Sequence, residues 1–377
     1  MRIAVLDEAK AGEPRVAITP ETIGKLKGMG ATIAIEKGAG LSSSISDDAY
    51  EAAGASIGKA ADVLKDSDVL LSVRRPAVES LAKLKKGAVV LGIMDPYGNG
   101  EALAPLAAKG VSLFSMELMP RITRAQVMDV LSSQANLAGY RAVIDASSVY
   151  GRAFPMMMTA AGTVPAARVF VMGAGVAGLQ AIATARRLGA IVTATDVRPA
   201  AKEQVASLGA KFIAVEDDEF KQAETAAGYA KPMSAEYQAK QAALVAEHIA
   251  KQDIVITTAL IPGRAAPVLV SKAMVESMRL GSVIVDLAVE RGGNCELSSP
   301  DKIVTHNGVQ IVGFANSAAR LAPTASALYA KNLFAFLETM IDKKEGKLAI
   351  NWDDELVKAT CLSRDGALVH PMFAPKS

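Results

Sequence analysis

The sequence of 377 residues contains few aromatic residues, cysteines and histidines and carries little net charge. Aromatic residues make up 5% of the chain and hydrophobic residues 51%, so the core must be mainly aliphatic, as in helices packed on parallel strands. The two cysteines, Cys295 and Cys361, cannot form a disulfide framework and lack metal-ligand spacing, so we expect buried thiols, no metal site and a reducing compartment. A net charge of +2 without a dense basic run gives no indication of nucleic-acid binding.

Long apolar segments of the kind that enter membranes are also missing. Asp7 and Glu8 follow the N-terminus almost directly, so no secretory signal is expected. The uncharged stretch 169–185 approaches the length of a membrane span, but its glycines, Gln180 and Thr184 suit a nucleotide-binding turn and helix. We therefore expect a cytoplasmic chain that does not insert into a membrane.

Strand-like and helical patterns alternate along the chain, which is typical of parallel sheets covered by helices. Because the length exceeds what one core usually organises, we expect two domains. A first series of strands is predicted at Arg2–Leu6, Thr32–Glu36, Val69–Val73, Ala88–Met94 and Val111–Met116. A second series is predicted at Arg168–Met172, Ile191–Thr195, Phe212–Val215, Asp253–Thr258, Val283–Leu287 and Gln310–Gly313. The predicted fold class is α/β, with two doubly wound, Rossmann-like domains.

Two helical patterns indicate how these domains connect. The stretch Ala125–Tyr150 contains no proline and predicts one long connecting helix. The amphipathic stretch Ala325–Met340 predicts a helix that returns the chain to the first domain. We therefore expect one domain of residues 1–132 plus 325–377, a second domain of residues 133–324, and ligand binding in the cleft between them.

A glycine-rich turn follows the first strand of the second series and opens a helix. Its sequence is Gly173-Ala174-Gly175-Val176-Ala177-Gly178. The first glycine allows the tight turn, the second lets the backbone approach a pyrophosphate, and the third lets the helix pack on the strand. Asp196 stands about 20 residues further on, where a carboxylate binds ribose hydroxyls and repels a 2'-phosphate. We predict NAD(H) rather than NADP(H), with Arg198 near the adenine or diphosphate, although an arginine there can also accommodate a 2'-phosphate.

An unusually long connection, Glu216–Pro232, separates a predicted strand from a helix that starts at Ser234. Connections in α/β units are usually 2 to 6 residues long, so this segment is either disordered or a functional lid. Gly228 and Tyr229 stand at the tip of an otherwise polar stretch, which favours a lid that carries one aromatic side chain.

The sequence offers no obvious base for oxidising an alcohol or amine. The three histidines, His248, His306 and His370, all lie outside the N-terminal part of the first domain that should face the nicotinamide, so we expect structural or exposed roles for them. A polar cluster does occur where the first domain ends, and it consists of Arg121, Gln126, Asp129 and Ser132. Its spacing of three places the last three residues on one helical face, which is either solvated or functional.

The segments around this cluster and the glycine turn resemble the NAD(H)-binding component of proton-translocating nicotinamide nucleotide transhydrogenase. The resemblance covers nearly the whole chain. It rests on the stretches 121–129, 132–140, 153–163, 173–178, 195–198, 228–231, 257–263 and 286–290. It implies an oxidoreductase subunit that donates hydride from NADH directly to NADP+, which is bound on an NADP(H)-binding partner component. Membrane subunits would couple this transfer to proton translocation.

The resemblance also implies roles for individual residues. Arg121, Gln126, Asp129 and Ser132 would grip the nicotinamide, with Gln126 reaching toward the partner's nucleotide. Tyr229 would close over bound NAD(H) from a mobile loop. The cofactor-binding positions would be Gly173, Gly175, Val176, Ala177, Gly178, Asp196, Val197, Arg198, Gly228, Gln241 and Leu260. The chain would form a homodimer and dock as a separate subunit on the cytoplasmic face of a bacterial inner membrane.

The related alanine dehydrogenases supply an alternative. Arg15, in a stretch shared by both groups, matches a substrate-binding arginine of that relative. Other positions differ, because Arg74 replaces a substrate-binding lysine, the region Ile93–Pro96 offers no catalytic histidine, and Glu290 replaces an aspartate. Transfer between two nicotinamides needs alignment and exclusion of water rather than a base. An amino-acid dehydrogenase and a non-catalytic NAD-binding module remain as alternatives to the transhydrogenase component.

Overall fold

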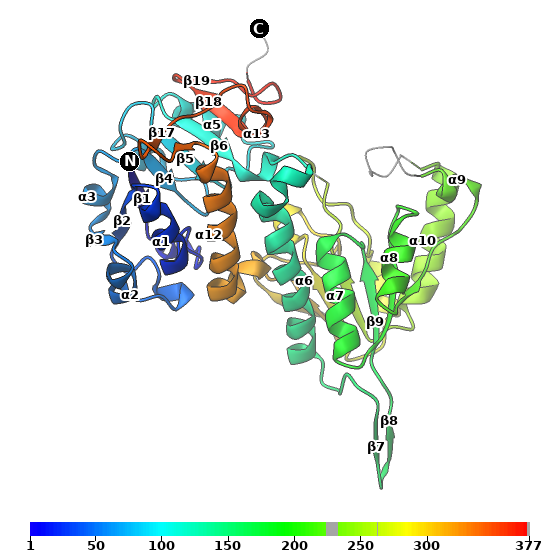
Figure 1. Cartoon of the computed structure of the whole chain (residues 1–377). Helices are drawn as coiled ribbons and strands as arrows, with labels where there is room; N and C mark the ends of the chain where they lie inside the picture. The colour runs from blue at the N-terminus through cyan, green and yellow to red at the C-terminus, as the bar shows by residue number, and fades with distance from the viewer. Residues whose placement is uncertain (224–232, 262, 375–377) are drawn as a thin grey trace. The chain divides into compact units, whose positions relative to one another are not determined.

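A computed structural model describes residues 1–223, 233–261 and 263–374 of the chain, and it divides into two compact units (Figure 1). Unit 1 comprises Met1–Gln134 and Ala319–Ser377, and unit 2 comprises Ala135–Ala318. Two elements cross the boundaries between the units, namely α6 (Val130–Val149) and the 3-10 helix η6 (Ser317–Leu321). Among the helices of the described residues, none combines the length and the hydrophobicity that a membrane span requires.

Among its described residues, unit 1 contains a sheet of eight strands in the order β19-β18-β6-β5-β4-β1-β2-β3. The strands from β6 to β3 are parallel, whereas β18 and β19 are antiparallel additions. The strands are β1 (Arg2–Val5), β2 (Thr32–Glu36), β3 (Ser56–Gly58), β4 (Val69–Leu71), β5 (Val89–Gly92), β6 (Ser112–Ser115), β18 (Cys361–Arg364) and β19 (Ala367–Leu368). A separate small hairpin consists of β16 (Ile341–Asp342) and β17 (Lys347–Leu348).

Helices cover both faces of this sheet, because alternate residues of each strand enter different hydrophobic clusters. Ile3 and Val5 pack with α1 and α12, whereas Ala4 packs with α3, α4 and α5. The α-helices are α1 (Pro20–Gly28), α2 (Asp47–Ala52), α3 (Ala60–Leu64), α4 (Val78–Leu81), α5 (Gly100–Ala107), α12 (Ala322–Glu338) and α13 (Glu355–Thr360). The 3-10 helices are η1 (Ala9–Ala11), η2 (Leu41–Ser43), η3 (Met116–Leu118) and η4 (Thr123–Met128). Helix α1 begins as predicted, with Thr19 as its N-cap and Pro20 as its first residue.

Unit 2 contains a sheet in the order β11-β10-β9-β12-β13-β15-β14, which is parallel except for the edge strand β14. The strands are β9 (Arg168–Met172), β10 (Ile191–Thr195), β11 (Lys211–Phe212), β12 (Ile254–Thr257), β13 (Val283–Asp286), β14 (Ile303–His306) and β15 (Val309–Val312). Its helices are α7 (Val176–Arg187), α8 (Ala201–Ser207), α9 (Asp218–Lys221), α10 (Ala235–Ile249), α11 (Lys272–Ser277) and η5 (Val289–Arg291). When only the parallel strands of each sheet are numbered along the chain, both sheets have the strand order 3-2-1-4-5-6 of dinucleotide-binding folds. The predicted class of two Rossmann-like α/β units is therefore confirmed.

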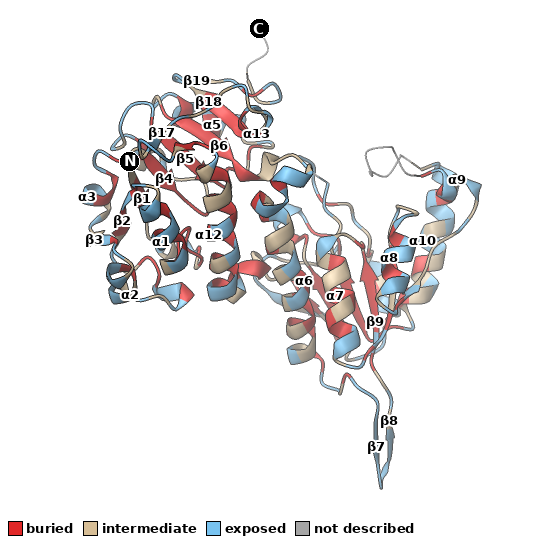
Figure 2. Ribbon diagram, in the orientation of Figure 1, coloured by how far each residue is buried: buried red, intermediate tan, exposed pale blue. Residues whose placement is uncertain are grey.

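Burial follows this layered arrangement, since the inner strands of both sheets are buried (Figure 2), whereas the edge strands β3, β11, β14 and β19 contain no buried residue. One hairpin lies outside this layered arrangement. Strands β7 (Met157–Thr159) and β8 (Gly162–Val164) pair only with each other among the described residues and extend away from the rest of unit 2 (Figure 1). Cys295 and Cys361 are both buried and free, as predicted for isolated thiols.

The predicted connecting helix is wrong at its start. Instead of running from Ala125 to Tyr150, the chain forms the 3-10 helix η4, bends at Asp129 and only then enters α6. Asp129 has an extended ψ of 93°, and its carboxylate accepts hydrogen bonds from the backbone N–H (2.9 Å) and the hydroxyl of Ser132. An aspartate that caps a new helix ends the preceding one, so Gln126 and Ser132 do not share a single helical face.

Candidate functional site

The glycine turn joins β9 to α7 at the carboxyl end of the unit 2 sheet. Gly173 has φ +105°, and a Cβ there would lie 2.5 Å from the Thr258 hydroxyl oxygen. A Cβ on Gly178 would overlap the backbone of Gly173, lying 2.8 Å from its carbonyl carbon. A Cβ on Gly175 would meet no atom within 4 Å. The first and third glycines therefore satisfy internal packing, whereas the second leaves its backbone open to a ligand.

The same turn supplies backbone donors for an anion. Gly175 is the N-cap of α7, and it has no side chain that could satisfy the first N–H groups of the helix. Such an N-terminus, with its partial positive charge, binds phosphate groups. Gly139 of α6 lies so close to Ala177 that any side chain would clash with the Ala177 carbonyl. Sequence reasoning missed this glycine, because its role depends on a neighbouring helix rather than on a turn.

Asp196 follows β10, the strand beside β9, and its side chain is only 7% exposed. One carboxylate oxygen accepts a hydrogen bond from the Ala174 N–H at 2.7 Å, which ties the acid to the glycine turn. The Arg198 guanidinium pairs with both oxygens, at 3.0 and 3.1 Å. Arg198 is therefore engaged with Asp196, so the arginine's charge is largely neutralised where a 2'-phosphate would need it.

Two further predicted positions lie on the same edge of the sheet. Gln241 of α10 accepts from the Val215 N–H at 2.9 Å and donates to the Thr195 hydroxyl at 3.1 Å, so it fixes the loops after β10 and β11. Leu260 follows β12 and is 55% exposed, as Val197 after β10 is 54% exposed. Exposed apolar side chains after neighbouring strands can form the apolar walls of a nucleotide site.

A buried asparagine holds the Leu260 loop, and sequence reasoning did not identify it. Asn294 is fully buried and forms hydrogen bonds with Ala259 N (2.9 Å), Ala259 O (2.9 Å) and Pro267 O (2.8 Å). Its own N–H donates at 2.8 Å to Asp286, which ends β13. The loop after β12 is therefore fixed by side chains that follow β13.

The second half of the predicted lid, residues 224–232, lies outside the described residues. Gly228 and Tyr229 belong to residues 224–232, so the structure does not place them. The portion of Glu216–Pro232 that is described contains α9, which Asp217 caps through the Phe220 N–H at 3.0 Å. The segment was predicted as a continuous loop, and this short helix is a difference from that prediction.

The predicted nicotinamide cluster lies in unit 1, on and beside η4. Arg121 and Gln126 are exposed, whereas Asp129 and Ser132 are half-buried and bonded to each other as the cap of α6. No side-chain hydrogen bond of Gln126 occurs within the described part of the chain. The structure therefore brings Asp129 and Ser132 into contact and leaves the Gln126 amide presented to solvent.

None of the three histidines stands as an uncommitted base. His248 Nε2 lies 2.9 Å from the Thr193 hydroxyl, its ring packs edge-on against Phe170, and burial lowers its pKa. His306 pairs with Glu276 at 2.9 Å, and His370 lies 3.2 Å from the Ala359 carbonyl oxygen. Their contacts are those of structural histidines.

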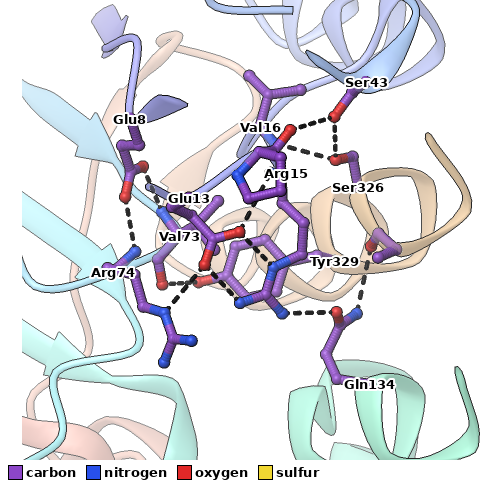
Figure 3. Close-up of polar contacts among 12 residues, drawn as sticks. Glu8, Glu13, Arg15, Val16, Ser43, Val73, Arg74, Gln134, Ser326 and Tyr329 are labelled. Atoms are coloured by element: carbon purple, nitrogen blue, oxygen red, sulfur yellow. Dashed lines mark hydrogen bonds and ion pairs between the residues drawn. The ribbon is translucent and has the colours of Figure 1, made fainter. Parts of the chain in front are cut away.

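Arg15, compared above with a substrate-binding arginine of alanine dehydrogenases, is internally neutralised (Figure 3). Arg15 is 3% exposed, pairs with both oxygens of Glu13 at 2.8 Å and donates to Gln134 at 2.8 Å. Burial alone would raise the pKa of Glu13, but the hydrogen bonds and charges of Arg15 and Arg74 lower it to about 2. Glu8 closes the cluster by accepting from the Val73 and Arg74 N–H groups, and burial raises its pKa to about 7.

The strand order, the open glycine at the helix N-terminus and the acid after the second strand define a dinucleotide-binding α/β protein. Comparison with known proteins agrees. The chain belongs to the alanine dehydrogenase/PNT family, whose N-terminal domain model matches residues 4–138 and whose C-terminal domain model matches residues 142–371.

Comparison with individual relatives distinguishes the transhydrogenase component from alanine dehydrogenase, the two groups that the sequence resembles. The chain is 55% identical to an NAD(P) transhydrogenase subunit alpha polypeptide of Rhodospirillum rubrum, over 98% of each chain. The crystal structure of transhydrogenase from Sinorhizobium meliloti superposes with a TM-score of 0.90 and 62% identity, covering 98% of this chain and 100% of that one. Alanine dehydrogenase 1 of Staphylococcus aureus is 29% identical, over 91% of this chain and 88% of the relative. The predicted resemblance to the transhydrogenase component is therefore confirmed, and alanine dehydrogenase is the more distant relative.

Proposed function

We propose that this chain is the NAD(H)-binding subunit of a proton-translocating NAD(P) transhydrogenase. The observation that carries the proposal is the glycine turn, in which Gly173 and Gly178 are packed while Gly175 is open toward a ligand. When bound, NADH supplies the hydride that passes to NADP+ held by a partner component. The similarity to the Rhodospirillum rubrum and Sinorhizobium meliloti proteins supports the assignment.

The residues of unit 2 would hold the nucleotide. Backbone N–H groups at the start of α7 bind the diphosphate, and Asp196 binds the ribose hydroxyls from its place beside the turn. Val197, Arg198, Gln241 and Leu260 line the adenosine and the adjoining loops. Gly228 and Tyr229 complete the predicted set from the segment outside the described residues.

The residues of unit 1 would act on the nicotinamide end. Arg121, Gln126, Asp129 and Ser132 orient the ring, and Gln126 reaches toward the second nucleotide. The reaction moves a hydride between two carbons and releases no O–H or N–H proton, so these side chains need only align the rings and exclude water. The engagement of all three histidines elsewhere is consistent with a reaction that uses no base.

The wider assembly also belongs to the proposal. We place domain boundaries at residues 1–132 plus 325–377 and 133–324, and expect a homodimer docked with an NADP(H)-binding subunit on membrane-spanning components at the cytoplasmic face of the bacterial inner membrane. The β7–β8 hairpin supports an assembly, because Met156 and Met158 are 56% and 81% exposed there. Exposed apolar side chains on a projecting hairpin are typical of interaction surfaces.

Reconstitution tests the proposal. The chain mixed with an NADP(H)-binding transhydrogenase component should oxidise NADH in the presence of NADP+, followed by stopped-flow absorbance with an NADH analogue of distinct spectrum. The chain alone, given NADH, pyruvate and ammonia, should show no turnover. Alanine formation by the homogeneous chain would instead identify an amino-acid dehydrogenase. NADH binding without transfer to any partner would identify a non-catalytic binding module.

A further inference from the structure

Asn332 is a buried polar side chain to which the proposed function assigns no role. It lies on α12 and is 7% exposed. Its Nδ2 donates to the Val127 carbonyl at 2.8 Å, and its Oδ1 accepts from the Ser133 hydroxyl at 2.7 Å. A carbonyl can only accept, so Val127 fixes which way the amide points and Ser133 must donate. Both hydrogen-bonding ends of this amide are therefore committed.

The two partners of Asn332 stand on opposite sides of the bend at Asp129. Val127 is in η4, directly after Gln126, whereas Ser133 is in the first turn of α6. A 3-10 helix of this length is weakly self-supporting, so its position depends on external contacts. Ala125 and Met128 supply some of them, being 1% and 4% exposed, while Gln126 points outward. The Asn332 amide therefore links η4 to α6 across the bend, and its contact with η4 is at Val127, the residue that follows Gln126.

A second contact holds η4, but from the surface. Arg124 pairs with Asp354 through two hydrogen bonds of 2.8 Å, and Asp354 is the N-cap of α13. The Arg124 side chain is 48% exposed, and exposed ion pairs contribute little to rigidity because water and salt screen them. A buried hydrogen bond to the backbone is the stronger restraint.

We propose that Asn332 is a positioning residue for hydride transfer, which fixes the η4 backbone so that Gln126 is presented in the productive orientation. The inference rests on the proposed function of Gln126. It explains why an amide rather than an apolar side chain occupies a buried position on α12, where a polar group is costly unless fully bonded. Asn332 does not itself reach a nucleotide in this proposal, because both ends of its amide are used within unit 1.

The test measures transfer and binding separately in the reconstituted complex. Asn332→Ala should slow hydride transfer by about tenfold or more, since small misplacements of reacting groups are costly, while NADH affinity is unchanged. Asn332→Asp offers a donor to Val127 only when its carboxyl is protonated, so its transfer rate should rise as pH falls, relative to wild type. Tyr329→Phe is the matched control, because the hydroxyl that it removes from α12 bonds to the carbonyls of Ser72 (2.8 Å) and Val73 (3.3 Å), neither of which belongs to η4.

A double variant separates this inference from the function on which it rests. If Asn332 acts through Gln126, then Gln126→Asn combined with Asn332→Ala should transfer no more slowly than Gln126→Asn alone. Additive slowing would overturn the inference, as would transfer by Asn332→Ala at the rate of Tyr329→Phe. If Asn332→Ala does not fold, Asn332→Ser, which is too short to reach Val127, is measured instead against the same criteria. A wild-type rate for Gln126→Asn would refute the alignment role of Gln126 itself.

Discussion

Two alanine substitutions in the glycine turn should separate folding from nucleotide binding. Gly175 has an ordinary φ of −75°, and a Cβ there meets no atom within 4 Å. Gly175→Ala should therefore fold with near wild-type stability. A Cβ on Gly178 would lie 2.8 Å from the carbonyl carbon of Gly173 and closer still to its oxygen, where real Cβ atoms keep more than 3.0 Å away. Helix α7 would have to shift away from the turn.

The two substitutions should change different quantities. Overpacking of this sort costs about 1–3 kcal/mol of stability, only partly offset by the roughly 1 kcal/mol by which alanine favours a helix over glycine. Gly178→Ala should thus lower the free energy of unfolding and also weaken NADH binding, because the helix N-terminus moves. Gly175→Ala should weaken NADH binding by about tenfold or more with its stability intact, because the new methyl group occupies the approach to the diphosphate.

Urea unfolding measures the stability of both variants and the wild type, and calorimetric titration measures their affinity for NADH. Binding of NADH by Gly175→Ala as tightly as by the wild type would refute a role of Gly175 in the approach of the diphosphate. Unfolding of Gly178→Ala at the wild-type urea concentration would show that a Cβ at this position does not clash with the Gly173 backbone.

Three further outcomes follow from the same contacts. NADH should bind more tightly than NADPH in calorimetry, and Asp196→Ala should narrow that difference; equal wild-type affinities would contradict the role of the acid. Gln126→Asn should slow stopped-flow hydride transfer on the order of 100-fold while NADH affinity holds, and a variant that simply fails to bind NADH would argue against alignment. Glu13→Gln should cost about 3–5 kcal/mol of unfolding free energy at pH 7, because Arg15 loses its buried partner. The folded pKa of Glu13 is about 2 against an ordinary 4.5, so this contribution is present above pH 4.5 and is lost as pH falls toward 2, which urea titrations across that range would reveal.

Much of the fold was predictable because both sheets depend on local patterns. Aliphatic strands, helix caps such as Thr19 and the glycine turn are local features, and they place the NAD(H) edge of unit 2. The four antiparallel hairpins of the described residues were missed, and two of them, β14–β15 and β18–β19, have turns that are visible in the sequence. Asn307-Gly308 and Asp365-Gly366 all have positive φ, as two-residue hairpin turns require.

The remaining features depend on contacts that no local pattern contains. Asn332 bonds to Val127 across 205 positions of the chain, and Asn294 holds a loop that lies 35 positions before it. The bend at Asp129 was missed for a related reason. Helical periodicity continues through the bend. Only the hydrogen bond from the Ser132 N–H to the Asp129 carboxylate shows where one helix ends and the next begins.

The repetition of one strand order in both units bears on how many nucleotides a single chain can hold. In such sheets, ligands enter at the carboxyl ends of the two central strands where the order reverses, which in unit 1 are β1 and β4. There the segment after β1 contributes Glu8 and Glu13, and the segment after β4 contributes Arg74, which pairs with Glu13 at 2.9 Å. The chain's own charged side chains thus pair with one another at the first crevice, and of these two places in the described part of the chain it is the second that has a glycine turn open to a diphosphate. Each copy of the chain should therefore take up one equivalent of NADH, and an assembly that needs a second nucleotide must obtain it from another polypeptide.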